Sequence, residues 1–79
     1  MNSQDEYYMN LQEKILTECI EKRVPATVYL NNGFQMRGII IACDTFVIVL
    51  ITEEKQQMLY KHSVSTIAPM RPLECLENR

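Results

Sequence analysis

Covalent chemistry has few candidate residues in this chain. It carries one histidine, His62, and no C-x-x-C pair that could hold a metal. Asp44 is a candidate catalytic acid, but an aspartate between two expected strands more often caps the backbone N–H groups of a turn. No glycine-rich phosphate loop and no nucleophile–base pair accompanies it. The residues therefore predict no enzyme, no metal site and no cofactor.

Non-covalent chemistry is better represented, because aromatic and basic side chains stand where strands are expected to begin or end. Phe46 follows a turn, and an aromatic ring there can stack on a base, contributing about 1–3 kcal/mol per base. Lys61 can contact a base edge and His62 a phosphate or sugar. The plainer interpretations are a core Phe46, a solvated Lys61 charge and a His62 bonded to backbone. From position alone these plainer interpretations are favoured.

A second group of candidates surrounds the turn Asn31-Asn32-Gly33. Asn and Gly tolerate positive φ, so this tripeptide predicts a hairpin turn. Tyr29 and Phe34 flank the turn, and both rings can stack on bases. Gly33 has no side chain, which would let a base approach the backbone. An ordinary hairpin with a half-buried tyrosine is the alternative interpretation.

Length limits how this chain can be stable. Its 79 residues make one domain, which buries little surface and is marginal alone. The three cysteines are odd in number and widely spaced, and no signal peptide precedes them, so reduced thiols in a cytoplasm are expected. The longest apolar run, Phe46–Ile51, is too short to span a membrane. Oligomerisation remains as the expected route to stability.

The formal net charge of −2 argues mildly against binding nucleic acid through a general basic field. Any RNA binding must then depend on where a few basic and aromatic side chains are placed.

One helix and five strands are expected to position these side chains. Apolar residues at helical spacing predict a helix over about 10–23, starting at a capping-box-like Asn10–Glu13 and ending before Pro25. Strands follow over about 26–68, and a hydrophobic one at Phe46–Ile51 is expected to be buried on both faces. Residues 1–9 are predicted to be an N-terminal extension, and residues 71–79 a short tail, mobile from Leu73 onward.

Gly38, inside the second strand, predicts a sharp bend or a close approach of another backbone. A five-stranded antiparallel sheet bent there would close into a small barrel. Its last two strands are short, and their exposed edges would pair with another chain. A ring of identical subunits joined strand to strand would satisfy both edges and supply the burial that one chain lacks.

Three segments, in this order, resemble the Hfq family of bacterial Sm-like RNA chaperones: residues 24–33, 38–50 and 60–67. The tripeptide Tyr60-Lys61-His62, before a short β-branched strand, is similar to the second Sm motif of that family. The match extends roughly from Gln12 to Pro72. The resemblance implies an Sm-like domain over residues 10–70, assembled into a homohexameric ring. It also implies a chaperone without covalent chemistry that pairs small regulatory RNAs with mRNAs.

The resemblance further implies two RNA faces and a rim. Uridine-rich RNA is expected on a proximal face formed by Gln12, Thr45, Phe46, Tyr60, Lys61 and His62. Adenine-rich RNA is expected on a distal face formed by Tyr29, Asn32, Gly33, Phe34, Gln35, Met36, Arg37, Gln57 and Thr66. The amide of Gln57 suits bidentate contact with adenine. Lys22 and Arg23 are expected to form a basic outer rim.

The chain departs from the family pattern at four places. Thr45 stands where glutamine is common, and Gln35 replaces a lysine of some members. The turn Thr52–Lys55 is one residue longer than usual. Glu21 stands in a rim that is arginine-rich in many members, which keeps a second hypothesis open. That hypothesis is an Sm-like ring acting mainly as a protein scaffold with weak RNA binding; a small enzyme, the third hypothesis, has no supporting constellation.

Overall fold

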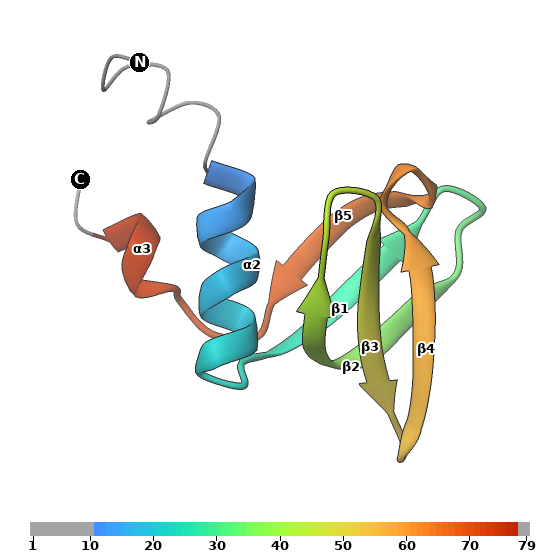
Figure 1. The fold of residues 1–79 in the computed structure, drawn as a ribbon, viewed down its shortest axis with the longest axis horizontal. Coiled ribbons are helices and arrows are strands. Elements are labelled where there is room, and N and C mark those ends of the chain that lie inside the picture. The colour runs from blue at the N-terminus through green and yellow to red at the C-terminus, as the bar shows by residue number, and fades with distance from the viewer. Residues whose placement is uncertain (1–10, 78–79) are drawn as a thin grey trace.

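Helix α2 (Leu11–Glu21) opens the described part of this computed structural model, which comprises residues 11–77 (Figure 1). The helix buries Leu16 and Cys19 on its apolar side. It ends in a Schellman-type cap: Arg23 has a φ of 52°, and the Val24 N–H donates to the Cys19 carbonyl at 3.0 Å. The predicted helix is confirmed, whereas its predicted start at Asn10 and the extension 1–9 lie outside the described residues.

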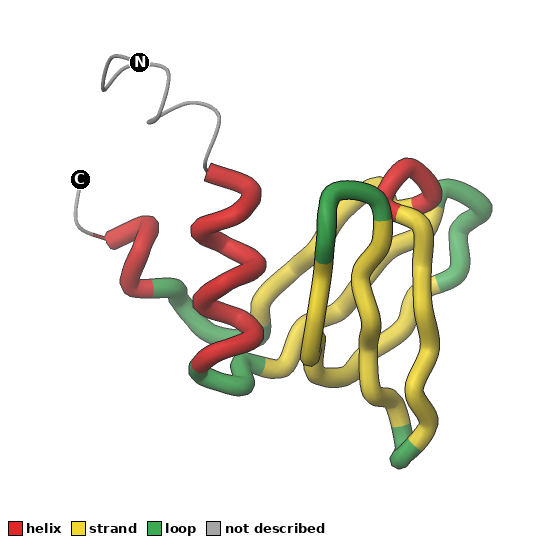
Figure 2. The backbone as a smooth tube through the Cα atoms, viewed as in Figure 1, coloured by secondary structure: helices red, strands yellow, loops and turns green. Residues whose placement is uncertain are grey.

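Five antiparallel strands follow, and they form one sheet in the order β4-β3-β2-β1-β5 (Figure 2). Their bounds are β1 Pro25–Leu30, β2 Gln35–Cys43, β3 Val47–Thr52, β4 Lys55–Tyr60 and β5 Val64–Pro69. A 3-10 turn, η1 (Lys61–Ser63), joins β4 to β5. The sequence predicts Lys61 among the basic residues that stand where a strand begins or ends. In the structure β4 ends at Tyr60, and Lys61 is the first residue of η1.

The sheet is strongly bent around a core that it shares with α2. The core residues are Leu16, Ala26, Val28, Ile40, Ile48 and Leu50. Gly38 permits the bend, because a Cβ built at this position would lie 2.1 Å from the Ile51 carbonyl oxygen of β3. The predicted close approach of another backbone at Gly38 is therefore confirmed.

The bent sheet stays open. Strands β4 and β5 are its two edges, and within residues 11–77 neither one pairs with the other. The barrel expected from the sequence is thus not closed by one chain alone. Strand β3 also differs from expectation, since Ile48 and Leu50 are buried while Val47 and Val49 on the other face are only half-buried.

The segment after β5 is ordered where the sequence predicted a mobile tail. Leu73 is only 3 % exposed and packs with Cys19 and Val24. A short helix, α3 (Glu74–Glu77), then lies beside α2 (Figure 1). The tail prediction is wrong for residues 73–77, because a buried leucine and contacts with α2 hold this segment. No helix in residues 11–77 is long and apolar enough to cross a membrane.

Leu73→Ala is expected to lower the free energy of unfolding by about 2–4 kcal/mol, because it empties a filled position between α2 and β1. Leu76→Ala is the matched control, since Leu76 is 37 % exposed and its truncation should cost less than about 1 kcal/mol. Urea titrations followed by circular dichroism give both values. Equal midpoints for the two variants would contradict the anchoring role of Leu73.

Candidate nucleic-acid interface

Phe46 and Lys61 are brought together through their backbones. The Lys61 N–H donates a 2.7 Å hydrogen bond to the Phe46 carbonyl, where η1 begins beside the turn before β3. The Phe46 ring is 72 % exposed. Phe46 is therefore not a core residue, and the plainer interpretation of it is wrong. Its aromatic ring and the ammonium group of Lys61 extend from hydrogen-bonded backbone.

Asp44 fixes the turn that presents Phe46. Its Oδ1 accepts hydrogen bonds from the N–H groups of Phe46 at 2.8 Å and Val47 at 2.9 Å. The bond from Phe46, followed by that from Val47, lowers the pKa of the Asp44 carboxyl. The predicted capping role of Asp44 is confirmed, and its carboxylate is committed to backbone.

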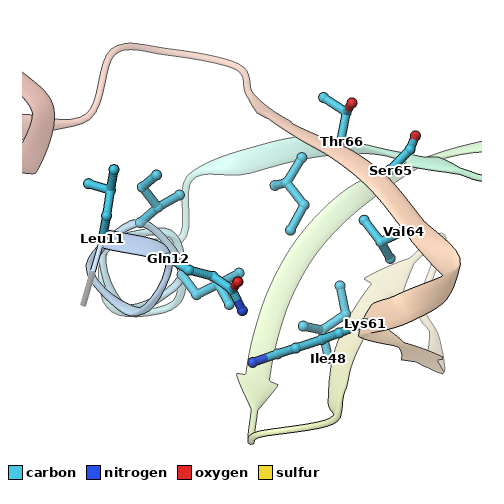
Figure 3. Close-up of a pocket in the computed structure, with 10 residues that line it drawn as sticks. Leu11, Gln12, Ile48, Lys61, Val64, Ser65 and Thr66 are labelled. Carbon is cyan, nitrogen blue, oxygen red and sulfur yellow. The ribbon is translucent and has the colours of Figure 1, made fainter. Parts of the chain in front are cut away.

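Gln12 of α2 faces the same region across a groove. The groove has a volume of about 400 Å³ and lies between α2, β3 and β5. Figure 3 shows the Gln12 amide and the Lys61 ammonium group extending toward one another over it. A second hollow, of about 490 Å³, is lined by Gln12, Thr45 and Lys61. Amide, hydroxyl and ammonium donors thus line adjoining hollows.

Two further aromatic rings accompany η1. The rings of Tyr60 and His62 have centroids 5.8 Å apart and are tilted by 34°. The His62 carbonyl accepts a 2.8 Å hydrogen bond from Asn31 Nδ2, and the Ser63 carbonyl accepts one of 2.9 Å from the Asn31 N–H. The first hairpin turn therefore helps to hold η1. We refer to the six residues expected on the proximal face as the Lys61 surface: Gln12, Thr45, Phe46, Tyr60, Lys61 and His62.

The first hairpin presents a different surface. Tyr29 of β1 pairs directly with Gln35 of β2 and Thr66 of β5, so the three side chains lie in a row on one face of the sheet. Arg37 lies two residues beyond Gln35 and shares that face. We refer to Tyr29, Phe34, Gln35, Arg37 and Thr66 as the Tyr29 surface.

The turn of this hairpin exposes Phe34, whose side chain is 69 % exposed. Asn32 Oδ1 accepts a 3.0 Å hydrogen bond from the Phe34 N–H. Gly33 has a φ of 95°, which explains the glycine there, and apart from its two chain neighbours no residue has an atom within 4 Å of the position of its missing Cβ. The open space at Gly33 leaves the backbone accessible beside the Phe34 ring.

Two residues expected on the distal face lie elsewhere in a single chain. Met36 pairs with Val28 and packs against the core. Gln57 is on β4, at the opposite edge of the sheet from Thr66, and donates a 2.8 Å hydrogen bond to Thr52 Oγ1. The family resemblance grouped Met36 and Gln57 with Tyr29. Within one chain, neither residue lies on the Tyr29 surface.

At the expected rim, Lys22 is already paired with carboxylates. Its Nζ lies 2.6 Å from Glu74 Oε1 and 3.8 Å from Glu18 Oε2, and the hydrogen bond to Glu74 raises the pKa of Lys22. Arg23 is exposed after the helix. Arg71 donates a 3.3 Å hydrogen bond to the Lys22 carbonyl, which adds a basic residue that the sequence reading missed because it is remote in the chain.

Both surfaces carry side chains that suit the binding of nucleic acid. The Lys61 surface combines an exposed ring with amide, hydroxyl and ammonium donors. The Tyr29 surface combines two rings with amide, hydroxyl and guanidinium groups. Within residues 11–77 there is no group of three His, Cys, Asp or Glu side chains able to hold a metal ion. Base stacking supported by hydrogen bonds is the chemistry that both surfaces favour.

Comparisons with known proteins agree on one family. The family model described as "Hfq protein" matches residues 11–74. The RNA-binding protein Hfq of Syntrophomonas wolfei is 41 % identical over 68 residues, covering 86 % of this chain and 83 % of the relative. That of Desulfitobacterium hafniense is 45 % identical over 65 residues, covering 82 % and 78 %. A crystal structure of the pleiotropic translational regulator Hfq superposes with a TM-score of 0.73 at 39 % identity, covering 75 % of this chain and 98 % of the other.

Proposed function

Because this chain belongs to the Hfq family, we propose that it is a non-enzymatic RNA chaperone. It binds small regulatory RNAs and mRNAs as single strands and promotes their pairing, and the cytoplasm is the compartment where such RNAs meet. The observation that carries the proposal is the backbone hydrogen bond between Lys61 and Phe46, which makes a residue with an exposed ring and a residue with an ammonium group neighbours in the fold. An exposed ring and a cation on adjacent backbone suit a stacked base with its phosphate.

The open sheet supports the proposed homohexamer. Among the described residues, 11–77, each of the edge strands β4 and β5 has one side that pairs with no other strand, and such an edge is a template for another strand. Met58 and Tyr60 on the outer face of β4 are 54 % and 53 % exposed, an unusual amount of apolar surface at an edge. Pairing of β4 with β5 of the next chain would cover this edge.

We expect sedimentation at micromolar concentration to give a particle of six chain masses. The physical reason is that a 79-residue chain with two free sheet edges buries too little surface to be stable alone. A Met58→Lys, Tyr60→Lys double variant is expected to shift the particle to smaller masses, because two ammonium groups would then lie at the edge that pairs. A compact, stable monomer of the natural sequence would contradict the ring.

Binding of uridine-rich RNA tests the role of the Lys61 surface. Lys61→Ala and Phe46→Ala are each expected to weaken oligo-U binding by about tenfold or more, since each removes a base contact of roughly 1–3 kcal/mol. Oligo-A binding should stay within about twofold, because the Tyr29 surface is untouched. The measurement is a pair of fluorescence-anisotropy titrations with both oligonucleotides.

The control for this test is Lys55→Ala, which removes an exposed lysine from the far end of β4. It should leave both affinities unchanged if contact at the Lys61 surface, and not the total charge, determines oligo-U binding. Equal losses on oligo-U and oligo-A in Lys61→Ala would mean that the two surfaces are not separate sites. Failure of the natural protein to bind either oligonucleotide at low salt would favour the protein-scaffold alternative.

A further inference from the structure

Two of the three cysteines, far apart in the sequence, meet in the same small cluster. Cys19 of α2 is fully buried together with Val24 and Leu73, and Cys75 of α3 packs against this group. The neighbouring residue, Glu18, ties the two helices. Its carboxylate oxygens accept hydrogen bonds from the N–H groups of Glu74 at 2.7 Å and Cys75 at 2.8 Å. The backbone of Cys75 is therefore held against the helical turn that carries Cys19.

We propose that Cys19 and Cys75 are a reversible oxidation site, which forms a disulfide that fastens α3 to α2 when the protein meets a small-molecule disulfide. Both cysteines are free thiols in the structure. The proposal concerns the periphery of the subunit, and it does not depend on how RNA is bound.

The reaction proceeds by two thiol–disulfide exchanges. The Cys75 thiol, which is partly exposed, loses its proton and attacks the small disulfide, forming a mixed disulfide and releasing one small thiolate. The Cys19 thiolate then attacks Cys75 Sγ, which forms the protein disulfide and releases the second small thiolate. Two protons leave the protein thiols and two are taken up by the released thiolates. The protein dithiol loses two electrons and the small disulfide gains them.

In the reduced protein both cysteines are protonated thiols. Desolvation raises the pKa of both thiols, and the Glu18 carboxylate raises each pKa further. The third cysteine, Cys43, is exposed at the end of β2 and lines a different hollow. It is therefore no partner for Cys19 within one chain.

The bridge would join the chain before β1 to the chain after β5. The closed loop contains all five strands, so the crosslink would restrain the opening of α3 and of the β5 edge from the rest of the domain. Reduction by a small thiol would release it. In the reduced protein the buried Leu73 already holds this segment against Cys19 and Val24.

The experiment uses full-length protein carrying Cys43→Ser, incubated natively with oxidised glutathione. Intact-mass measurement is expected to show a loss of about 2 Da, the two thiol hydrogens. Trypsin should then give residues 15–22 and 62–79 as one crosslinked peptide, because the first holds Cys19 and the second Cys75. Amide hydrogen exchange at residues 74–77 should slow by about tenfold or more on oxidation, with no change in the β3–β4 turn.

Single variants in the same background separate the bridge from other oxidation products. Cys19→Ser should stop at a glutathione adduct on Cys75, and Cys75→Ser should show little reaction because Cys19 is buried. A stable glutathione adduct on Cys75 in the parent protein, with no crosslinked peptide, would overturn the proposal. A crosslink between two copies of residues 62–79, or no oxidation at all, would overturn it equally.

Discussion

Gly38→Ala is expected to lower the free energy of unfolding by about 3 kcal/mol or more, which is enough to unfold a domain of this size. The added Cβ would lie 2.1 Å from the Ile51 carbonyl oxygen and 3.0 Å from both the Ile51 carbonyl carbon and Thr52 Cγ2. A side chain could turn away from such a clash, but a backbone carbonyl within a β-ladder cannot. Ile51 pairs with both Ile39 and Gln56, so moving it disturbs β2, β3 and β4 together.

Gly33→Ala is the matched control for this substitution. Gly33 has a φ of 95°, and apart from its two chain neighbours no residue has an atom within 4 Å of its missing Cβ, so alanine there carries only a backbone penalty of roughly 1–2 kcal/mol. Urea unfolding followed by circular dichroism should be measured at one protein concentration for all variants, because assembly also contributes to stability. If Gly38→Ala unfolds at the same urea concentration as the natural protein, β2 and β3 do not approach as closely as the structure shows.

The bend at Gly38 illustrates which parts of the fold the sequence could predict. Glycine inside a β-branched strand, Asn-Gly in a turn and proline after a helix each indicate a particular local backbone conformation, because glycine permits what other residues avoid and proline ends a helix. Gly38, the turn at Asn31–Gly33 and the helix end before Pro25 could therefore be predicted, and all three are confirmed. The closure of the sheet could not be predicted, because it depends on whether two distant strands meet. Leu73 looked like a tail residue because the cavity it fills is made by Cys19 and Val24, far away in sequence.

For the candidate surfaces, too, the residue types could be predicted from the sequence, but their neighbours in the fold could not. Residue types identified Phe46 and Tyr29 as groups able to stack on a base, and Lys61 as a group able to contact a base edge. Their spacing along the chain could not show that Lys61 bonds to Phe46, or that Tyr29 lies between Gln35 and Thr66. Those neighbours result from strand register. Met36 is the clearest example, since the family resemblance grouped it with Gln35 on one surface, whereas strand alternation turns it toward the core.

Oligo-A is expected to bind more tightly than oligo-U, and with a shallower dependence on salt. The net charge of −2 per chain would be repeated in each subunit of a ring, which weakens long-range attraction for RNA. At the rim, Lys22 is paired with Glu74 and Glu18 and offers little free charge. Affinity must then come mainly from stacking and hydrogen bonds, which depend less on salt than phosphate contacts do.

Tyr29→Ala and Phe34→Ala are each expected to reduce oligo-A affinity by about 10-fold to 100-fold, because each removes one stacking ring at roughly 1–3 kcal/mol per base. Phe34 is 69 % exposed at the open turn, and Tyr29 lies in a row with Gln35 and Thr66, whose polar groups can pair with a stacked base. On the Lys61 surface, Phe46 carries an open ring, whereas Tyr60 lies against His62 at the β4 edge that the proposed ring would cover. Two open rings on the Tyr29 surface should therefore outweigh one. Anisotropy titrations with oligo-A and oligo-U over a salt series provide the comparison, with sedimentation confirming that each variant stays assembled. Phe46→Ala serves as the control that should leave oligo-A affinity unchanged. Tighter binding of oligo-U at every salt concentration, or full oligo-A affinity in both alanine variants, would show that the Tyr29 surface is not the stronger RNA site.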